Sequence, residues 1–196
     1  MRNGAAGESL MIFRLFRPRE DRMRVHAIYA EIVAQARQPA FYSRLGVPDT
    51  LEGRYEMLML HAFLYMHRLK DEAEPVKDMA QKVFDLMFSD MDRSLRELGV
   101  GDLTVPKKIK KMAQAFYGRA SAYDSALDQS APALADAVLR NVFSGEASAK
   151  ANAKAVAAYI KNAAEVLAKQ GADALTTTGP VFPAPAPVAS KKRKAG

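Results

Sequence analysis

Cysteine is absent from this chain of 196 residues. Its absence excludes a disulfide framework, a thiol nucleophile and a cysteine-based zinc site. Histidine is nearly as scarce, and the three present are His26, His61 and His67. His61 and His67 are six residues apart, on opposite sides of the helix expected there, so they cannot hold one metal ion together. We interpret each histidine as a packing or edge residue rather than as a metal ligand.

The motifs of several common enzyme classes are missing as well. The chain contains no GxxxxGK[ST] phosphate loop, no GxGxxG opening a helix, no HExxH, no GxSxG and no aspartate-rich DDxxD. Asp85, Asp90 and Asp92 lie on one predicted helix, and we interpret them as part of a solvated surface rather than as a metal site. We therefore expect a non-enzymatic protein without a metal or a cofactor.

Apolar runs are too short to span a bilayer, which takes roughly 20 residues. The most apolar stretch is residues 50–70, in which Glu56 and His61 interrupt a dense series of apolar and aromatic residues. A run of this length bounded by charges predicts a buried helix at the centre of the fold. Asp49, followed three residues later by Glu52, predicts a capping box at its start.

Polar residues of this central helix fall on two lines when they are placed at about 100° per residue. Arg54, His61 and Arg68 form one line, and Glu56 and His67 form the other on nearly the opposite side. We interpret all five as edge positions that make ordinary surface pairs. The alternative is a functional groove beside one of the lines.

Glycine and proline are few in the middle of the chain, and 49% of all residues are hydrophobic. We predict an all-α fold, a single helical domain of about six helices around the central apolar helix, with flexible basic tails. The expected domains are a flexible N-terminal segment at 1–19, the helical domain at 20–170, and a disordered Pro/Ala-rich tail with a basic tip at 171–196. The helices are expected at residues 20–37, 50–70, 75–98, 104–127, 131–143 and 148–170.

Positive charge is concentrated at the two ends. Residues 1–19 carry four arginines against one glutamate, and residues 171–196 carry four basic residues against one aspartate. The ends thus hold six of the seven net positive charges, and the body between them is nearly neutral. Such ends favour contact with phosphate or anionic lipid. The segment 11–20 mixes aromatic residues with arginines, which fits either a membrane interface or packing onto the domain.

A second basic cluster opens the helix expected at 104–127. Cations in the first turns of a helix oppose its dipole, so local stability does not explain them. They point to an anionic partner, and the alternative is a solvated face whose lysines pair with nearby acids. The cluster consists of Lys107, Lys108, Lys110 and Lys111.

Methionine is concentrated in the centre of the sequence. Its flexible, polarizable side chain can adapt to varied apolar helices. Helical spacing places most of these methionines in the core, but two or three in an open groove would suit a protein that holds apolar polypeptide. Seven of the ten lie between positions 57 and 112, namely Met57, Met59, Met66, Met79, Met87, Met91 and Met112.

Three blocks of sequence are distinctive. Residues 47–56 are VPDTLEGRYE, residues 88–112 are FSDMDRSLRELGVGDLTVPKKIKKM, and residues 116–119 are FYGR. Together they resemble the ubiquinol–cytochrome c chaperone family, assembly factors of the cytochrome bc complex, which is respiratory complex III. The resemblance covers roughly residues 20–145, and the second block is its long and specific part.

The resemblance implies a non-enzymatic, all-helical protein that binds newly made cytochrome b and promotes assembly of the ubiquinol–cytochrome c reductase complex. We expect a bacterial member, cytoplasmic and peripheral at the cytoplasmic face of the inner membrane. On this interpretation client or partner contacts are assigned to Arg54, Glu56, Asp90, Asp92, Arg93 and Arg96. Contact with an anionic surface, either the membrane or the ribosome, is assigned to Lys107, Lys108, Lys110 and Lys111.

The alternative function is that of a basic helical nucleic-acid-binding protein, supported by the basic ends and the lysine cluster. It predicts steep salt dependence and measurable affinity for bare DNA or RNA. On the chaperone interpretation no specific DNA partner and no small-molecule substrate is expected.

Overall fold

Helices are the regular elements of the part of the chain that the structure describes. This computed structural model describes the backbone of residues 5–185 and the side chains of residues 20–185. The all-α prediction is confirmed. The elements are α1 (Ala5–Ala36), α2 (Pro39–Ser43), α3 (Leu51–Leu69), α4 (Val76–Glu97), α5 (Val105–Gln129), α6 (Ala131–Val142), the 3-10 helix η1 (Ala147–Ala149), α7 (Lys150–Ala168) and α8 (Ala172–Thr177).

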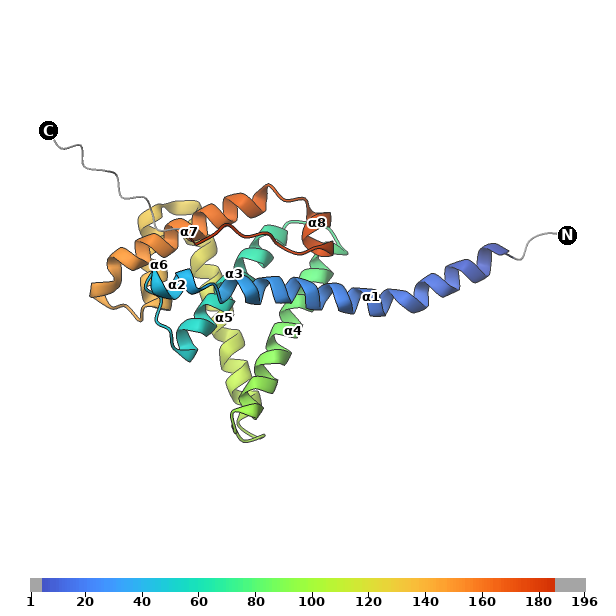
Figure 1. The fold of residues 1–196 in the computed structure, drawn as a ribbon, viewed down its shortest axis with the longest axis horizontal. Helices are drawn as coiled ribbons and strands as arrows, with labels where there is room; N and C mark the ends of the chain where they lie inside the picture. The colour runs from blue at the N-terminus through green and yellow to red at the C-terminus, as the bar shows by residue number, and fades with distance from the viewer. Residues whose placement is uncertain (1–4, 186–196) are drawn as a thin grey trace.

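Helix α3 lies at the centre of the arrangement, as predicted. It packs against α1, α4, α5, α6 and α7, while α6 lies along α7. Figure 1 shows α4 and α5 leaving this body together as a hairpin whose turn lies far from the other helices. Within the described residues, no helix is long and apolar enough to cross a membrane.

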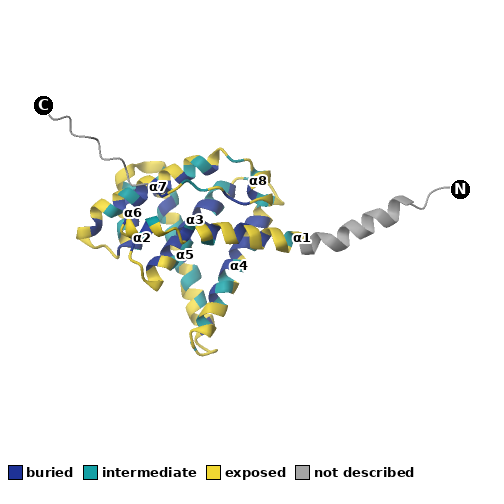
Figure 2. Ribbon diagram, in the orientation of Figure 1, coloured by how far each residue is buried: buried dark blue, intermediate teal, exposed yellow. Residues whose placement is uncertain are grey.

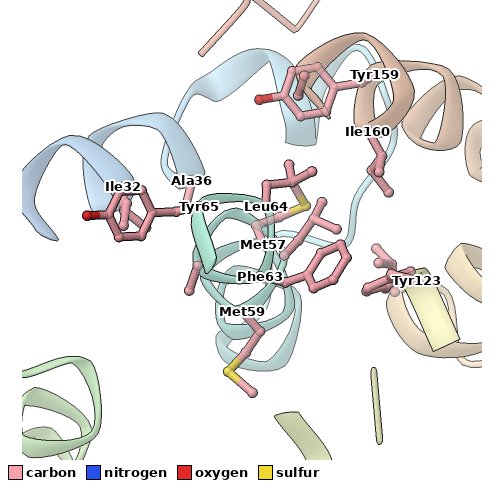
Figure 3. Packing of buried hydrophobic residues seen from close by; sticks show 14 of the residues in the cluster. Ile32, Ala36, Met57, Met59, Phe63, Leu64, Tyr65, Tyr123, Tyr159 and Ile160 are labelled. Atoms are coloured by element: carbon pink, nitrogen blue, oxygen red, sulfur yellow. The ribbon is translucent and has the colours of Figure 1, made fainter. Parts of the chain in front are cut away.

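The core around α3 uses most of the methionines. Eleven of the 19 residues of α3 are buried, which confirms that it is a core helix and not a surface one. Side chains from α1, α5 and α7 surround it, as Figure 3 shows for Ile32, Tyr123 and Ile160. The fully or nearly fully buried methionines are Met57, Met59, Met79, Met87 and Met91.

The start of α3 differs from the predicted capping box. Thr50 is the N-cap, and its hydroxyl oxygen accepts a hydrogen bond from the Gly53 backbone N–H at 3.1 Å. Asp49 instead pairs with Arg54 at 2.7 Å, which lowers the pKa of the Asp49 carboxyl. Gly53 is needed for close approach, because a Cβ there would lie 2.0 Å from the Pro48 carbonyl oxygen.

His61 is completely buried, so its interpretation as a surface edge residue is wrong. Its Nδ1 donates to the Met57 carbonyl at 2.7 Å, because a carbonyl only accepts, and Nε2 then accepts from the Tyr159 hydroxyl at 2.8 Å. Gln35 donates to the same Tyr159 oxygen at 2.9 Å. Burial lowers the pKa of His61 to about 4, although the Met57 carbonyl acts in the opposite direction.

Glu56 is likewise buried rather than at an edge, with 8% of its surface exposed. Arg119 of α5 donates to both of its carboxylate oxygens, at 2.6 and 2.5 Å. Burial raises the pKa of Glu56, and the guanidinium of Arg119 opposes that rise. The pair joins the first half of α3 to the middle of α5 by a two-point contact.

The other polar positions of α3 are edge positions, as expected. Arg54 is exposed in its pair with Asp49, and His67 lies 2.6 Å from Asp124 of α5. Arg68 pairs with Glu72 at 2.6 Å, and it also donates to backbone carbonyls at the end of α7.

Both ends of the helical domain lie outside the predicted limits. Helix α1 begins at Ala5 and not near residue 20, and it continues through Gly7 and Pro18. At the other end, residues 172–185 are packed on the domain, so the tail predicted from residue 171 starts too early. Leu175 is completely buried, and the Phe182 ring lies edge-on to His61 with 5.1 Å between centroids. The basic tip predicted at the end of that tail lies outside the described residues.

Acidification should destabilise the fold through His61. Unfolded His61 takes up a proton below about pH 6.5, whereas the folded side chain stays neutral down to about pH 4. Between these values the unfolded state holds more protons, so the free energy of unfolding falls with falling pH, by up to about 3 kcal/mol. Urea unfolding across this range should show a shallower pH dependence in His61→Gln than in the unmodified chain.

The matched control is His26→Gln, because His26 is exposed on α1. It should keep the pH dependence of the unmodified chain. An equally steep loss of stability in His61→Gln would contradict the assignment, since the loss would then come from other groups.

The Glu56–Arg119 pair should show strong coupling. Glu56→Gln or Arg119→Met alone should lower the free energy of unfolding by at least about 2 kcal/mol, because each leaves the other, buried or partly buried, group without its partner. The double variant should lose clearly less than the sum of the two. The exposed Asp49–Arg54 pair is the control, and its coupling should be much weaker. Additive losses for Glu56 and Arg119 would refute the coupling.

Candidate functional site

A cleft of about 660 Å³ opens between α1, the first half of α3, α4 and the start of α5. Its floor is apolar and aromatic, and Tyr29, Tyr55 and Met91 contribute to it. Leucines stand at its edge, where Leu51 is 67% exposed and Leu98 is 65% exposed. Leucines left this exposed beside an apolar floor are typical of a surface that binds another polypeptide.

Two tyrosines set the polarity of the floor. The Tyr29 hydroxyl donates to Asp90 at 2.9 Å, and burial together with this carboxylate raises the pKa of Tyr29. The Tyr55 hydroxyl is buried and has no hydrogen-bond partner within residues 20–185. Burial raises its pKa as well. The floor therefore holds neutral phenols, and one of them has an unused hydrogen-bonding group.

Three of the six residues predicted to contact a client or partner line this cleft. These are Arg54 and Glu56 of α3 and Asp90 of α4. Arg54 is exposed at the edge, while the carboxylate of Glu56 is already held by Arg119. Their role in binding stays a prediction, but the structure brings the three together from residues up to 36 positions apart.

The other three, Asp92, Arg93 and Arg96, lie further along α4 towards the hairpin turn. Arg96 pairs with Asp92 at 2.6 Å and also with Asp102 in the turn. Arg93 pairs with Asp90, which connects this ion-pair series to the cleft. Exposed pairs of this kind contribute little to stability. They leave one side of the hairpin covered with charge, and their contact role likewise stays a prediction.

The four lysines of α5 stand apart from the cleft. Lys107, Lys108, Lys110 and Lys111 are all exposed, and within the described side chains none of them forms an ion pair. The lysine face is solvated, as the alternative expects, but the pairing with nearby acids is not found among the described side chains. Their contact with an anionic surface remains a prediction.

Sequence reasoning missed the residues that give the cleft its form. Arg119 was noticed in the FYGR block without a role, because its partner Glu56 lies 63 positions earlier. Nothing in the sequence indicates that Leu51 and Leu98 are exposed. Two of the seven central methionines, Met91 and Met112, do line the cleft, while most of the others fill the core.

Comparison with known sequences points to one family. The family model for ubiquinol-cytochrome C chaperone matches residues 43–182. Ubiquinol-cytochrome-c reductase complex assembly factor 1 of Xenopus laevis is 23% identical over 141 residues, which cover 72% of this chain and 70% of that protein. The mouse protein of the same name is 23% identical over 154 residues, 79% of this chain, and the match spans 52% of its length.

Comparison with solved structures agrees. The crystal structure of the Cbp3 homolog from Brucella abortus matches with a TM-score of 0.79 at 42% sequence identity. The match covers 89% of this chain and 97% of that one. The family model reaches residue 182 and so includes α7 and α8, which lie beyond the roughly 20–145 of the resemblance. The chain belongs to the ubiquinol-cytochrome c chaperone family.

Proposed function

We propose that this protein is a non-enzymatic chaperone that binds newly made cytochrome b and promotes assembly of the ubiquinol–cytochrome c reductase complex. Membership of the family supports the assembly role, since the named relatives are assembly factors of that complex. The observation that carries the choice of client is the cleft between α1, α3, α4 and α5. A membrane protein such as cytochrome b offers the apolar helices that would fill it.

The chemistry of the cleft fits a helical segment with one apolar face. Its apolar floor would receive that face, and the exposed Leu51 and Leu98 would close over it. Complete burial of a leucine stabilises a contact by about 1.5–3 kcal/mol, so these two residues supply much of the expected affinity. Arg54 and Asp90 at the edge would then pair with polar groups flanking the segment.

A surface of this composition also suits a small partner protein. We propose that such a partner binds the ion-paired residues Asp92, Arg93 and Arg96 of α4. We propose that the lysines of α5 contact an anionic membrane or ribosomal surface, and that the protein works peripherally at the cytoplasmic face of the bacterial inner membrane. The nucleic-acid-binding alternative receives no support from the family. Its other support is the lysine cluster of α5, together with basic ends whose side chains lie outside the described residues.

The cleft should be blocked by replacing two exposed residues, Leu51→Glu and Ser94→Arg, which leave the core untouched. In the host, membranes should then contain several-fold less assembled, haem-loaded cytochrome b, because a charged edge opposes entry of an apolar segment. Cytochrome oxidase in the same membranes is the internal control. The matched variant is Met23→Glu with Val181→Glu, two exposed apolar residues that do not line the cleft.

Two results would count against these assignments. Normal cytochrome b in the cleft variant, with loss after deletion of the whole gene, would leave the assembly role standing and move the client site elsewhere. Normal cytochrome b after deletion would overturn the proposed function itself. Because the chain lacks cysteine, a single Ser94→Cys variant also permits site-specific crosslinking, and cytochrome b should be the protein captured.

A further inference from the structure

The end of the α4–α5 hairpin carries two exposed leucines. Figure 1 shows the hairpin extending away from the body, and Figure 2 shows that its end is largely exposed. We call residues 98–111 the hairpin tip. Leu98 is 65% exposed and Leu103, in the turn, is 89% exposed. A leucine at the outermost turn of a projection contributes nothing to the core, so packing does not account for it.

The lysines lie directly beside these leucines. Val105 and Phe116 mark the face of α5 that is buried, and at 100° per residue Lys107, Lys110 and Lys111 fall on the side away from it, while Lys108 lies on its flank. Lys107 to Lys111 are within about 9 Å of the start of α5 along the helix axis, since each residue advances it by 1.5 Å. The tip thus carries leucines at its end and ammonium groups one or two turns behind them.

Neighbouring acids do not neutralise this charge. Asp102 is the acidic residue of the tip, and it is already paired with Arg96. Four unpaired lysines in the first turns of α5 repel one another and oppose the helix dipole. A negatively charged partner would remove both effects. The exposed leucines favour a lipid surface over a nucleic acid as this partner, because a phosphate backbone such as that of RNA offers leucine no apolar environment.

We propose that the hairpin tip docks on an anionic lipid bilayer. Leu98 and Leu103 enter the boundary between head groups and acyl chains, and the lysines lie at the level of the lipid phosphates. The proposal deepens the assigned function by naming the surface at which the chaperone works, but it rests on the tip alone and not on the identity of the client. Because Leu98 also stands at the edge of the cleft, docking brings the mouth of the cleft to the membrane surface.

The test is co-flotation of the full chain with vesicles, which involves no cytochrome b. Vesicles of phosphatidylcholine containing phosphatidylglycerol should bind the chain, and binding should weaken steeply with salt. Replacing all four tip lysines by glutamine should weaken it by about tenfold or more. Replacing Leu98 and Leu103 by serine should weaken it severalfold without changing its dependence on salt.

Matched controls separate the tip from general charge and apolarity. Four exposed lysines of α7 and its end, replaced by glutamine, give the same loss of charge elsewhere, and Met23→Ser with Val181→Ser removes the same kind of exposed side chain. Both sets should bind vesicles as the unmodified chain does. Every variant keeps the basic residues of 1–19 and 186–196, so any contribution from them is common to all. The α7 set is Lys150, Lys154, Lys161 and Lys169.

Insertion can be followed directly because the chain has no cysteine. A single Leu103→Cys variant, labelled with an environment-sensitive fluorophore, should shift to the blue with anionic vesicles and be quenched by brominated acyl chains. Val181→Cys should do neither. All of these residues are exposed, and unchanged thermal unfolding would verify that the variants fold.

Three results would overturn the proposal. The first is failure of the unmodified chain to float with anionic vesicles, and the second is binding that the tip variants leave unchanged. The third is binding that needs the lysines but not the leucines, accompanied by equal affinity for ribosomal RNA, which would identify the surface as ribosomal. None of these results bears on the cytochrome b assay, so the tip and the proposed function fail independently.

Discussion

Burial of two ionisable side chains in α3 is the constraint on which the rest of the structure depends. This helix packs against five others, and leaving Glu56 or His61 unpaired inside the protein would cost several kcal/mol. Glu56 pairs with Arg119, which thereby fixes α5. His61 pairs with Tyr159, and Gln35 extends that network to α1. The polar groups thus set the positions of helices that hydrophobic burial alone would allow to slide.

The hairpin and the cleft follow from this arrangement. Arg119 holds α5 to the body near its middle, so the earlier part of α5 and its partner α4 extend beyond the core. Aromatic contacts keep the two helices together, including Phe84 with Phe116 at 5.1 Å between ring centroids. The cleft lies where this extension separates from α1 and α3, which is why one hairpin serves both the cleft and the tip.

Local sequence predicted the helices far better than it predicted their partners. Residues 50–70 and 75–98 were identified within two residues at each end, because dense apolar spacing and flanking charges or prolines mark them. Periodicity placed Glu56 and His61 on opposite sides of α3 but had no means of showing that neighbours cover both sides. The packing of residues 172–185 was not predicted, because threonines and prolines surround Leu175 and Phe182. That composition is typical of a disordered tail, although both side chains pack on the domain. The lining of the cleft could not be predicted from the sequence, because its residues come from four helices.

Contact between the first and last described segments sets an order of events in time. Gln35 of α1 donates to the carbonyl of Pro183, and Gly179 lies against Ile28. Gln35 and Pro183 are 148 positions apart, and their contact cannot form before residue 183 has been synthesised. Until then α1 and His61 lack part of their covering. A chain interrupted before this point would expose apolar side chains that the last segment covers, so the helical domain is fully covered only when residues up to 183 are present.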